Sequence, residues 1–193
     1  EESSLSARFH ETILAVLGET ALKQYEWPSL HEVRSLSARL YHAEGIDVQW
    51  LAAGTVPLPG DAQGVRSYAG QWANEFQLQA DALSRSLWQR ENRRGRTSQD
   101  CFPGAVVCTD GSTADNGLVF GAHLAWSGNH QQTIEWLHDA QYQWQLGEWL
   151  APGEGRLAAG ASLQTPEVVA SCSTQGLNGL AANFHAELRQ RLN

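Results

Sequence analysis

The sequence has no methionine, almost no lysine and no long apolar run. Because methionine is absent from all 193 residues, we expect the numbering to begin inside a longer gene product. Lys23 is the only lysine among 13 cationic residues, which face 21 acidic ones and leave a net charge of −8. This balance argues against nucleic acid or an anionic membrane as a partner. No apolar stretch reaches the ~18 residues that a membrane-spanning helix needs.

Cysteine is scarce as well. The chain has three, Cys101, Cys108 and Cys172, and it contains no Asn-x-Ser/Thr glycosylation site. An odd number of cysteines does not suit a disulfide framework, and thiols stay reduced in the cytoplasm. The sequence therefore predicts free thiols and a cytoplasmic protein.

Alternation of apolar and polar residues dominates most of the chain. In residues 33–41, for example, Leu36, Ala38 and Leu40 share one face, which is typical of a half-buried strand. Strand-like runs are predicted at residues 33–41, 46–56, 118–126, 133–137, 142–146 and 167–173. Short turns separate these runs, and Pro57 and Pro59 should end the second one. The pattern indicates an all-β sandwich.

Two features add detail to this fold. Residues 133–137 and 142–146 are predicted to form a hairpin. The C-terminal segment carries apolar residues at spacings of 3, 4, 4 and 4, which predicts an amphipathic helix over residues 176–192. Its apolar stripe consists of Leu177, Leu180, Phe184, Leu188 and Leu192.

The chain is rich in tryptophan, with eight in 193 residues. Indole rings fill the wide interior of a sandwich, and they also serve as platforms on which sugars stack. Trp126 and Trp144 alternate in phase with aliphatic residues, so the pattern favours the core for these two.

The densest charged segment is residues 90–98, where Arg90, Arg93, Arg94 and Arg96 surround Glu91. Guanidinium groups bind carboxylates through two parallel hydrogen bonds, so the segment could dock on an acidic surface or line a polar site. The alternative is a solvated basic turn, because charged runs usually face water.

Motifs for metal or nucleophile chemistry are absent from the sequence. It contains no His-Glu-x-x-His, Cys-x-x-Cys or Gly-x-Ser-x-Gly, and His123, His130 and His138 fall on different segments. We therefore expect no metal, no cofactor and no catalytic residue in this chain.

Several separated strings resemble the N-terminal domain of family 36 glycoside hydrolases, the bacterial α-galactosidases. They are SYAGQWANEFQ at 67–77, RENRRGRTS at 90–98, Phe102-Pro103, GAHLAWSGNH at 121–130, LAPGE at 150–154, Gly160, TPE at 165–167, GLNGL at 176–180 and Phe184-His185. The resemblance covers the chain from about Val33 to its end, in the same order as in the family.

The resemblance implies a β-supersandwich of the galactose-mutarotase-like kind over residues 1–175, with residues 1–32 matching poorly. The helix at 176–193 would lead toward a (β/α)8 catalytic barrel. The parent protein would be a homo-oligomeric, retaining hydrolase of terminal α-D-galactosides in oligosaccharides such as melibiose and raffinose.

The family's catalytic motifs lie in the barrel and are missing here. The family nucleophile is an Asp in a Lys-x-Asp motif, whereas Lys23 is followed by Gln24 and Tyr25. A retaining glycosidase needs two carboxyl groups about 5–5.5 Å apart. We therefore expect the 193-residue chain alone to be inactive.

Two hypotheses for this chain follow. In the first it is a non-catalytic domain that supports the barrel and oligomer assembly, with eight interface or sugar-proximal candidates: Arg90, Glu91, Arg93, Arg94, Arg96, Trp126, Asn129 and His130. In the second it is an independent carbohydrate-binding module whose exposed tryptophans form stacking platforms.

Overall fold

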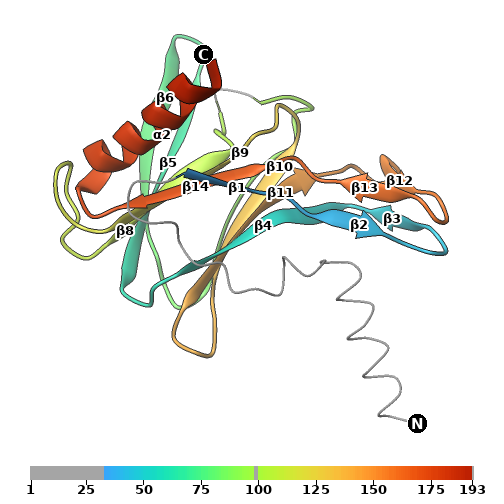
Figure 1. Cartoon of the computed structure of the whole chain (residues 1–193), viewed down its shortest axis with the longest axis horizontal. Coiled ribbons are helices and arrows are strands. Elements are labelled where there is room, and N and C mark those ends of the chain that lie inside the picture. The colour runs from blue at the N-terminus through green and yellow to red at the C-terminus, as the bar shows by residue number, and fades with distance from the viewer. Residues whose placement is uncertain (1–32, 98–99, 193) are drawn as a thin grey trace.

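A computed structural model describes residues 33–97 and 100–192 (Figure 1). The unassigned segment 1–32 and Ser98 of the arginine-rich segment lie outside these residues. Two antiparallel sheets pack face to face, which confirms the expected all-β sandwich. The larger sheet has the order β1 (Val33–Leu36), β14 (Val168–Ser173), β9 (Val119–Leu124), β8 (Gly104–Thr109), β5 (Ala62–Gln71) and β6 (Asn74–Ala82). The smaller sheet has the order β4 (Trp50–Leu58), β11 (Tyr142–Trp149), β10 (His130–Trp136) and β7 (Leu87–Asn92).

Two short ribbons form an arm that projects from one side of the sandwich (Figure 1). In one ribbon β2 (Arg39–Tyr41) pairs with β13 (Ser162–Gln164), and in the other β3 (Ile46–Val48) pairs with β12 (Gly155–Leu157). Leu40, Val48 and Leu150 form a small core of their own in this region. The arm is therefore held together by apolar packing that is separate from the main core.

The main core lies between the two sheets. Val65 and Val107 of the larger sheet and Ile134 and Trp144 of the smaller one are completely buried in it. The core position expected for Trp144 is thus confirmed. The same expectation for Trp126 is wrong, because β9 ends at Leu124 and the chain then turns, which leaves the indole 39% exposed.

Three strand predictions need correction. The run 46–56 is two strands, β3 and β4, which are divided at Gln49, where the carbonyl accepts a hydrogen bond from the Leu150 N–H. The proline Pro57 does not end its strand but lies inside β4 opposite Gln143, and β4 tolerates it because this strand is at a sheet edge. The turn begins at Pro59 instead, whose carbonyl accepts a hydrogen bond from the Ala62 N–H. Residues 33–41 form two strands rather than one, because Thr165 bonds both the N–H and the C=O of Ala38 between them.

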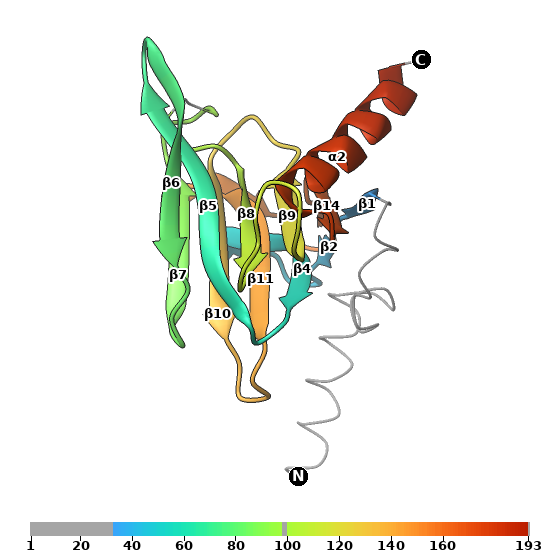
Figure 2. The same ribbon diagram turned by 90° about the vertical axis from the view of Figure 1, so that its left-hand side faces the viewer.

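The predicted hairpin and C-terminal helix are both present. Strands β10 and β11 pair in antiparallel register, and α2 (Gly176–Leu192) packs on the outer face of the larger sheet over β14, β9 and β1 (Figure 2). On the side of α2 that faces the sheet, Leu180 is buried, and Asn183 donates hydrogen bonds to the Ser171 hydroxyl and the Cys172 carbonyl. The last two residues of the apolar stripe, Leu188 and Leu192, remain exposed.

Candidate functional site

The arginine loop, residues 90–97, is held in shape by an amide side chain. Asn92 is buried at the end of β7. Its Oδ1 accepts the Arg94 N–H at 3.0 Å, and its Nδ2 donates to the Arg96 carbonyl at 2.8 Å. A side chain that bonds its own neighbouring backbone defines a tight turn. The loop is therefore a preorganised element rather than a loose basic turn.

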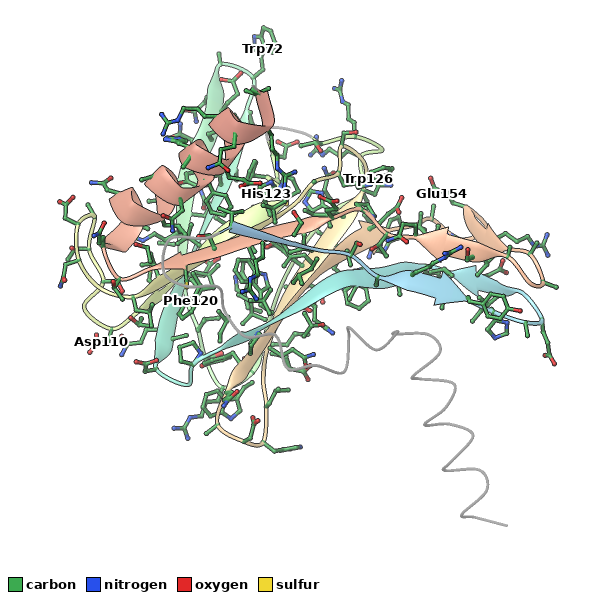
Figure 3. The ribbon with its side chains drawn as sticks, in the orientation of Figure 1. Trp72, Asp110, Phe120, His123, Trp126 and Glu154 are labelled. Carbon is green, nitrogen blue, oxygen red and sulfur yellow. The ribbon has the colours of Figure 1, made fainter. Side chains whose placement is uncertain are left out.

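The arginine loop is also bonded to the β9–β10 turn. The Gly95 N–H donates to Asn129 Oδ1 at 2.6 Å, and the Thr97 hydroxyl donates to the Trp126 carbonyl at 3.1 Å. Figure 3 shows Trp126 in the same upper half of the molecule as Trp72. The structure thus brings together the two predicted segments, which are some thirty residues apart in the sequence.

Two of the loop's arginines are engaged within the chain. Arg93 pairs with Glu91 at 2.8 Å and lies over the ring of Trp149, with its guanidinium carbon 4.4 Å from the ring centroid. Arg94 pairs with Asp100 at 2.7 Å. Exposed ion pairs contribute ~0–1 kcal/mol. These contacts therefore orient the side chains more than they stabilise the fold.

The other two arginines differ in direction. Arg90 points into the sandwich, where it donates a hydrogen bond to the Ser67 hydroxyl. Arg96 is exposed, and its guanidinium makes no hydrogen bond or ion pair with any residue in the described part of the chain. Of the four arginines among the predicted candidates, Arg96 is thus the one most available to an external carboxylate.

His130 lies beneath the loop rather than at the surface. It is 1% exposed, with Nε2 3.6 Å from the Cys101 Sγ and Nδ1 3.4 Å from the Gly128 carbonyl oxygen. Burial lowers the His130 pKa, the carbonyl opposes this effect, and Arg90 adds to it. Burial likewise raises the pKa of the Cys101 thiol. Both side chains are therefore neutral packing groups, out of reach of an external partner.

The most exposed aromatic surface was not predicted from the sequence. The hairpin of β5 and β6 presents Tyr68, Trp72, Phe76 and Leu78, which we call the hairpin face. Trp72 stands at the tip and is 86% exposed (Figure 3). The rings of Tyr68 and Phe76 each meet Phe102 edge to face, at centroid distances of 6.4 and 6.1 Å. Exposed aromatic groups of this size commonly mark binding surfaces.

Strand β6 differs from the rest of its sheet in the direction of its polar side chains, which face inward while its apolar ones face outward. Residues directly opposite each other in antiparallel strands project to the same face. Asp81 lies opposite the core residue Val65, so its side of β6 faces inward, whereas Leu78 lies opposite Tyr68 and faces outward. The inward side chains are Gln77, Gln79 and Asp81, and the outward ones are Leu78, Ala80 and Ala82. The sequence shows that polar and apolar residues alternate here, but it does not show which set faces inward.

An open cleft of about 630 Å³ separates the edge strands β6 and β7. Trp88 spans part of it, donating a hydrogen bond from Nε1 to Asp81 Oδ2 at 3.0 Å. The lining combines an indole with amide, carboxylate and guanidinium groups, and includes Gln79, Asp81, Trp88, Gln89 and Arg90. Such a mixture can bind a polar ligand through stacking and hydrogen bonds.

Acid–base and metal chemistry have little support in the described residues. Burial raises the pKa of Glu148, and Glu154 raises it further, but the Glu154 carboxylate already accepts the Ala151 N–H at 2.8 Å. No group of three or more His, Cys, Asp or Glu residues within 33–97 and 100–192 could hold a metal ion. The helix that the structure describes is neither long nor apolar enough to cross a membrane.

Comparisons with known proteins place these features in a family. Residues 32–158 match the model of the glycosyl hydrolase family 36 N-terminal domain. The chain is 37% identical over 138 residues to an α-galactosidase of Escherichia coli, covering 72% of this chain and 20% of that protein. It is 30% identical over 156 residues to α-galactosidase 2 of Pediococcus pentosaceus, covering 79% and 21%.

Solved structures agree. The galactosidase domain of the α-galactosidase-sucrose kinase AgaSK superimposes with a TM-score of 0.75 at 25% identity, over 82% of this chain and 22% of that one. A variant of the α-galactosidase AgaA from Geobacillus stearothermophilus, in complex with raffinose, gives 0.71 at 27% identity over the same shares. The chain spans about a fifth of these relatives' length. It belongs to the N-terminal domain family of the glycosyl hydrolase family 36 enzymes.

Proposed function

We propose that the chain is the non-catalytic N-terminal domain of an α-galactosidase that hydrolyses terminal α-D-galactosyl residues in oligosaccharides by a retaining mechanism. Membership of the family, with α-galactosidases as relatives, carries this proposal. The domain's role is to support the catalytic barrel and the assembly of a homo-oligomer. No disulfide joins the three buried cysteines in the described part of the chain, and reduced thiols suit a cytoplasmic protein.

A non-catalytic role agrees with the carboxyl groups that the structure describes. Retaining hydrolysis needs a nucleophile and an acid on either side of the scissile bond. Glu148 is the carboxyl group with a raised pKa, but Glu154 beside it is committed to the turn at Ala151. The galactoside is therefore bound and cleaved by the part of the enzyme that this domain supports.

The arginine loop and the β9–β10 turn supply a defined contact surface for that role. Arg96 and Trp126 are exposed on a backbone fixed by Asn92 and Asn129. A preorganised guanidinium loses little side-chain freedom when it pairs with a carboxylate. We assign Arg96 to a carboxylate of the barrel or of a second subunit, with Arg93 and Arg94 holding the loop beside it.

The activity test compares three proteins with a chromogenic α-galactoside. They are the purified 193-residue chain, AgaA lacking the segment that this chain matches, and a chimera of AgaA carrying residues 33–192 in that place. We expect turnover from the chimera alone. Turnover by the 193-residue chain that survives rigorous purification would overturn the non-catalytic role.

A second function, a stand-alone carbohydrate-binding module, is favoured by one specific observation. The exposed Trp72 and the cleft beside Trp88 offer an indole platform together with polar groups that can bond sugar hydroxyls. Isothermal titration of the 193-residue chain against galactose, melibiose and raffinose separates the two functions. Micromolar binding that is lost in a Trp72→Ala or Trp88→Ala variant would support the module.

A further inference from the structure

The outer face of the larger sheet is covered over only half its width. Helix α2 packs over β1, β14 and β9, with Leu180 and Phe184 against the sheet. Over β5 and β6 no helix or strand of the described residues lies on this face (Figure 2). The uncovered half carries the hairpin face, where Tyr68 and Leu78 are directly opposite each other, together with Arg66 opposite Ala80.

The hairpin face is apolar where an ordinary outer sheet face would be polar. Antiparallel sheets with one solvated face place their polar residues on it. Here Leu78 is 51% and Phe76 60% exposed, while the polar side chains of β6 point the other way. The polarity of β6 is therefore consistent with an outer face that is covered in the complete protein.

The hairpin also holds backbone conformations that are rare for its residues. Phe76 has φ 53° and Ala73 has φ 64°, in the left-handed region that favours glycine. At Phe76 this conformation brings the ring against Phe102. Such positions persist where the surroundings determine them, and they gather at binding sites.

We propose that the hairpin face is the docking surface for the catalytic remainder of an α-galactosidase, an inference that rests on the proposed function. The chain covers only 20–22% of its relatives' length, so a large body of protein accompanies this domain in those enzymes. The hairpin tip and the C-terminal end of α2 both lie at the top of the molecule in Figures 1 and 2, and Figure 2 shows them on opposite sides of it.

The end of α2 supports the same occupant. Leu188 and Leu192 continue the apolar stripe that begins at Leu177, yet they are 58% and 79% exposed. A partner seated at this end can contact both the helix end and the hairpin face. A body of protein that contacts both surfaces must be large, which suits the catalytic remainder of the enzyme rather than a small ligand.

Hydrogen exchange tests the docking directly. Backbone amides of residues 70–78 are compared by mass spectrometry in the 193-residue chain and in the AgaA chimera. Docking should slow their exchange in the chimera by about tenfold or more, since each tenfold corresponds to 1.4 kcal/mol. An active chimera in which the hairpin exchanges as fast as in the isolated chain would overturn the docking surface while leaving the proposed function intact.

A matched pair of double variants provides the second measurement. Tyr68→Ser with Leu78→Ser removes an aromatic and an aliphatic group from the hairpin face. Tyr41→Ser with Ile46→Ser removes a similarly exposed pair from the arm, on the far side of the molecule (Figure 1). In the isolated chain we expect both pairs to change the Tm little. In the chimera the hairpin pair alone should lower the Tm of this domain by about 3 °C or more.

Three other outcomes would contradict the docking surface or the proposed function. Equal destabilisation of the chimera by both pairs would contradict a specific surface at the hairpin. A dimer of the 193-residue chain in sedimentation, lost in the hairpin variant, would show that a second copy is the occupant instead. The control for the chimera is AgaA whose own segment has been removed and restored. If this control is active and the chimera is inactive, the proposed function on which the docking rests is rejected.

Discussion

The two halves of the outer sheet face carry similar residues in different settings. Where α2 covers the sheet, Val119 of β9 and Leu180 of the helix are buried, and the ring centroids of His123 and Phe184 lie 5.7 Å apart. On the hairpin, aromatic and aliphatic side chains of comparable size are exposed to solvent. Both halves present apolar side chains on this face, so the difference does not lie in the kind of residue that the face carries. It lies in whether the chain supplies a cover.

The covered half also shows what a cover contributes. Asn183 bonds the strand beneath it, and Arg191 donates to the Ser35 hydroxyl at 3.0 Å, so polar contacts fix the helix over the sheet. The hairpin has no equivalent contact with a covering element among residues 33–97 and 100–192. Substitutions in the two halves should therefore have unequal effects, which the following four predictions measure.

The largest difference should come from truncating one leucine in each half. Leu180→Ala removes a side chain that is 3% exposed, and we expect it to lower the free energy of unfolding by about 2–4 kcal/mol. Leu78→Ala removes one that is 51% exposed and should change it by about 0.5 kcal/mol or less. Urea unfolding of both variants measures the two values. Equal losses would contradict the contrast between the halves.

Two glycines of β5 provide the next comparison. A Cβ at Gly70 would lie 2.3 Å from the Asn74 carbonyl oxygen, so Gly70→Ala should distort the hairpin at a cost of about 1–3 kcal/mol. A Cβ at Gly64 would approach only the Asp81 carbonyl oxygen, at 3.6 Å, and Gly64→Ala should be tolerated. Hydrogen exchange of β6 reports the difference. A hairpin equally protected in both variants would show that the turn does not require Gly70.

The covered half should also respond to pH through His123. Burial, and next the charge of Arg191, lower its pKa from the ordinary 6.5, so the folded state resists a proton that the unfolded chain accepts. The free energy of unfolding should therefore fall as the pH drops below 6.5, until the folded imidazole is also protonated. His123→Phe keeps the ring packing and should weaken this dependence, leaving the part due to His130.

Urea unfolding at several pH values from 7.5 to 5 checks this prediction. His138→Phe, the same substitution at an exposed position, serves as the control variant. An unaltered slope in the His123→Phe variant would mean that the imidazole under α2 does not carry the effect.

The smallest effect should be a gain in stability at the hairpin tip. Ala73→Gly relieves a left-handed conformation that disfavours an L residue by roughly 1–2 kcal/mol, while the freer unfolded chain offsets roughly 0.4–1 kcal/mol. The net gain should be about 0–1.6 kcal/mol, seen as a slightly higher Tm. Ala82→Gly, at the end of β6 and without this conformation, should lower the Tm. A lower Tm in both variants would contradict backbone strain at Ala73.

Much of the fold was predictable because its strands follow local rules. Alternation located β9, β14 and the β10–β11 hairpin, and apolar spacing located α2. Failures arose where a tertiary contact decides the structure. Thr165 divides the strand at Ala38, and Pro57 is tolerated because β4 is at an edge, and neither fact is encoded nearby in the sequence.

The candidate site was predictable in composition but not in direction. The sequence identified the arginine loop and the β9–β10 turn, and the bonds of Asn129 and Thr97 show that these meet. It did not reveal that Arg90 and His130 point inward while Arg96 points outward. The hairpin face was missed because alternation states which residues share a face, and only the assembled sheet states which face is covered.

The pairing of β1 with β14 has a consequence for how the domain is made. Val33 lies opposite Ser171, so the first strand described here cannot find its partner until almost the whole domain has been synthesised. Contacts this far apart in sequence close late and slow folding. On the ribosome, β1 must therefore wait unpaired while the other strands emerge, and this sheet edge is where a nascent chain is most exposed to wrong pairing.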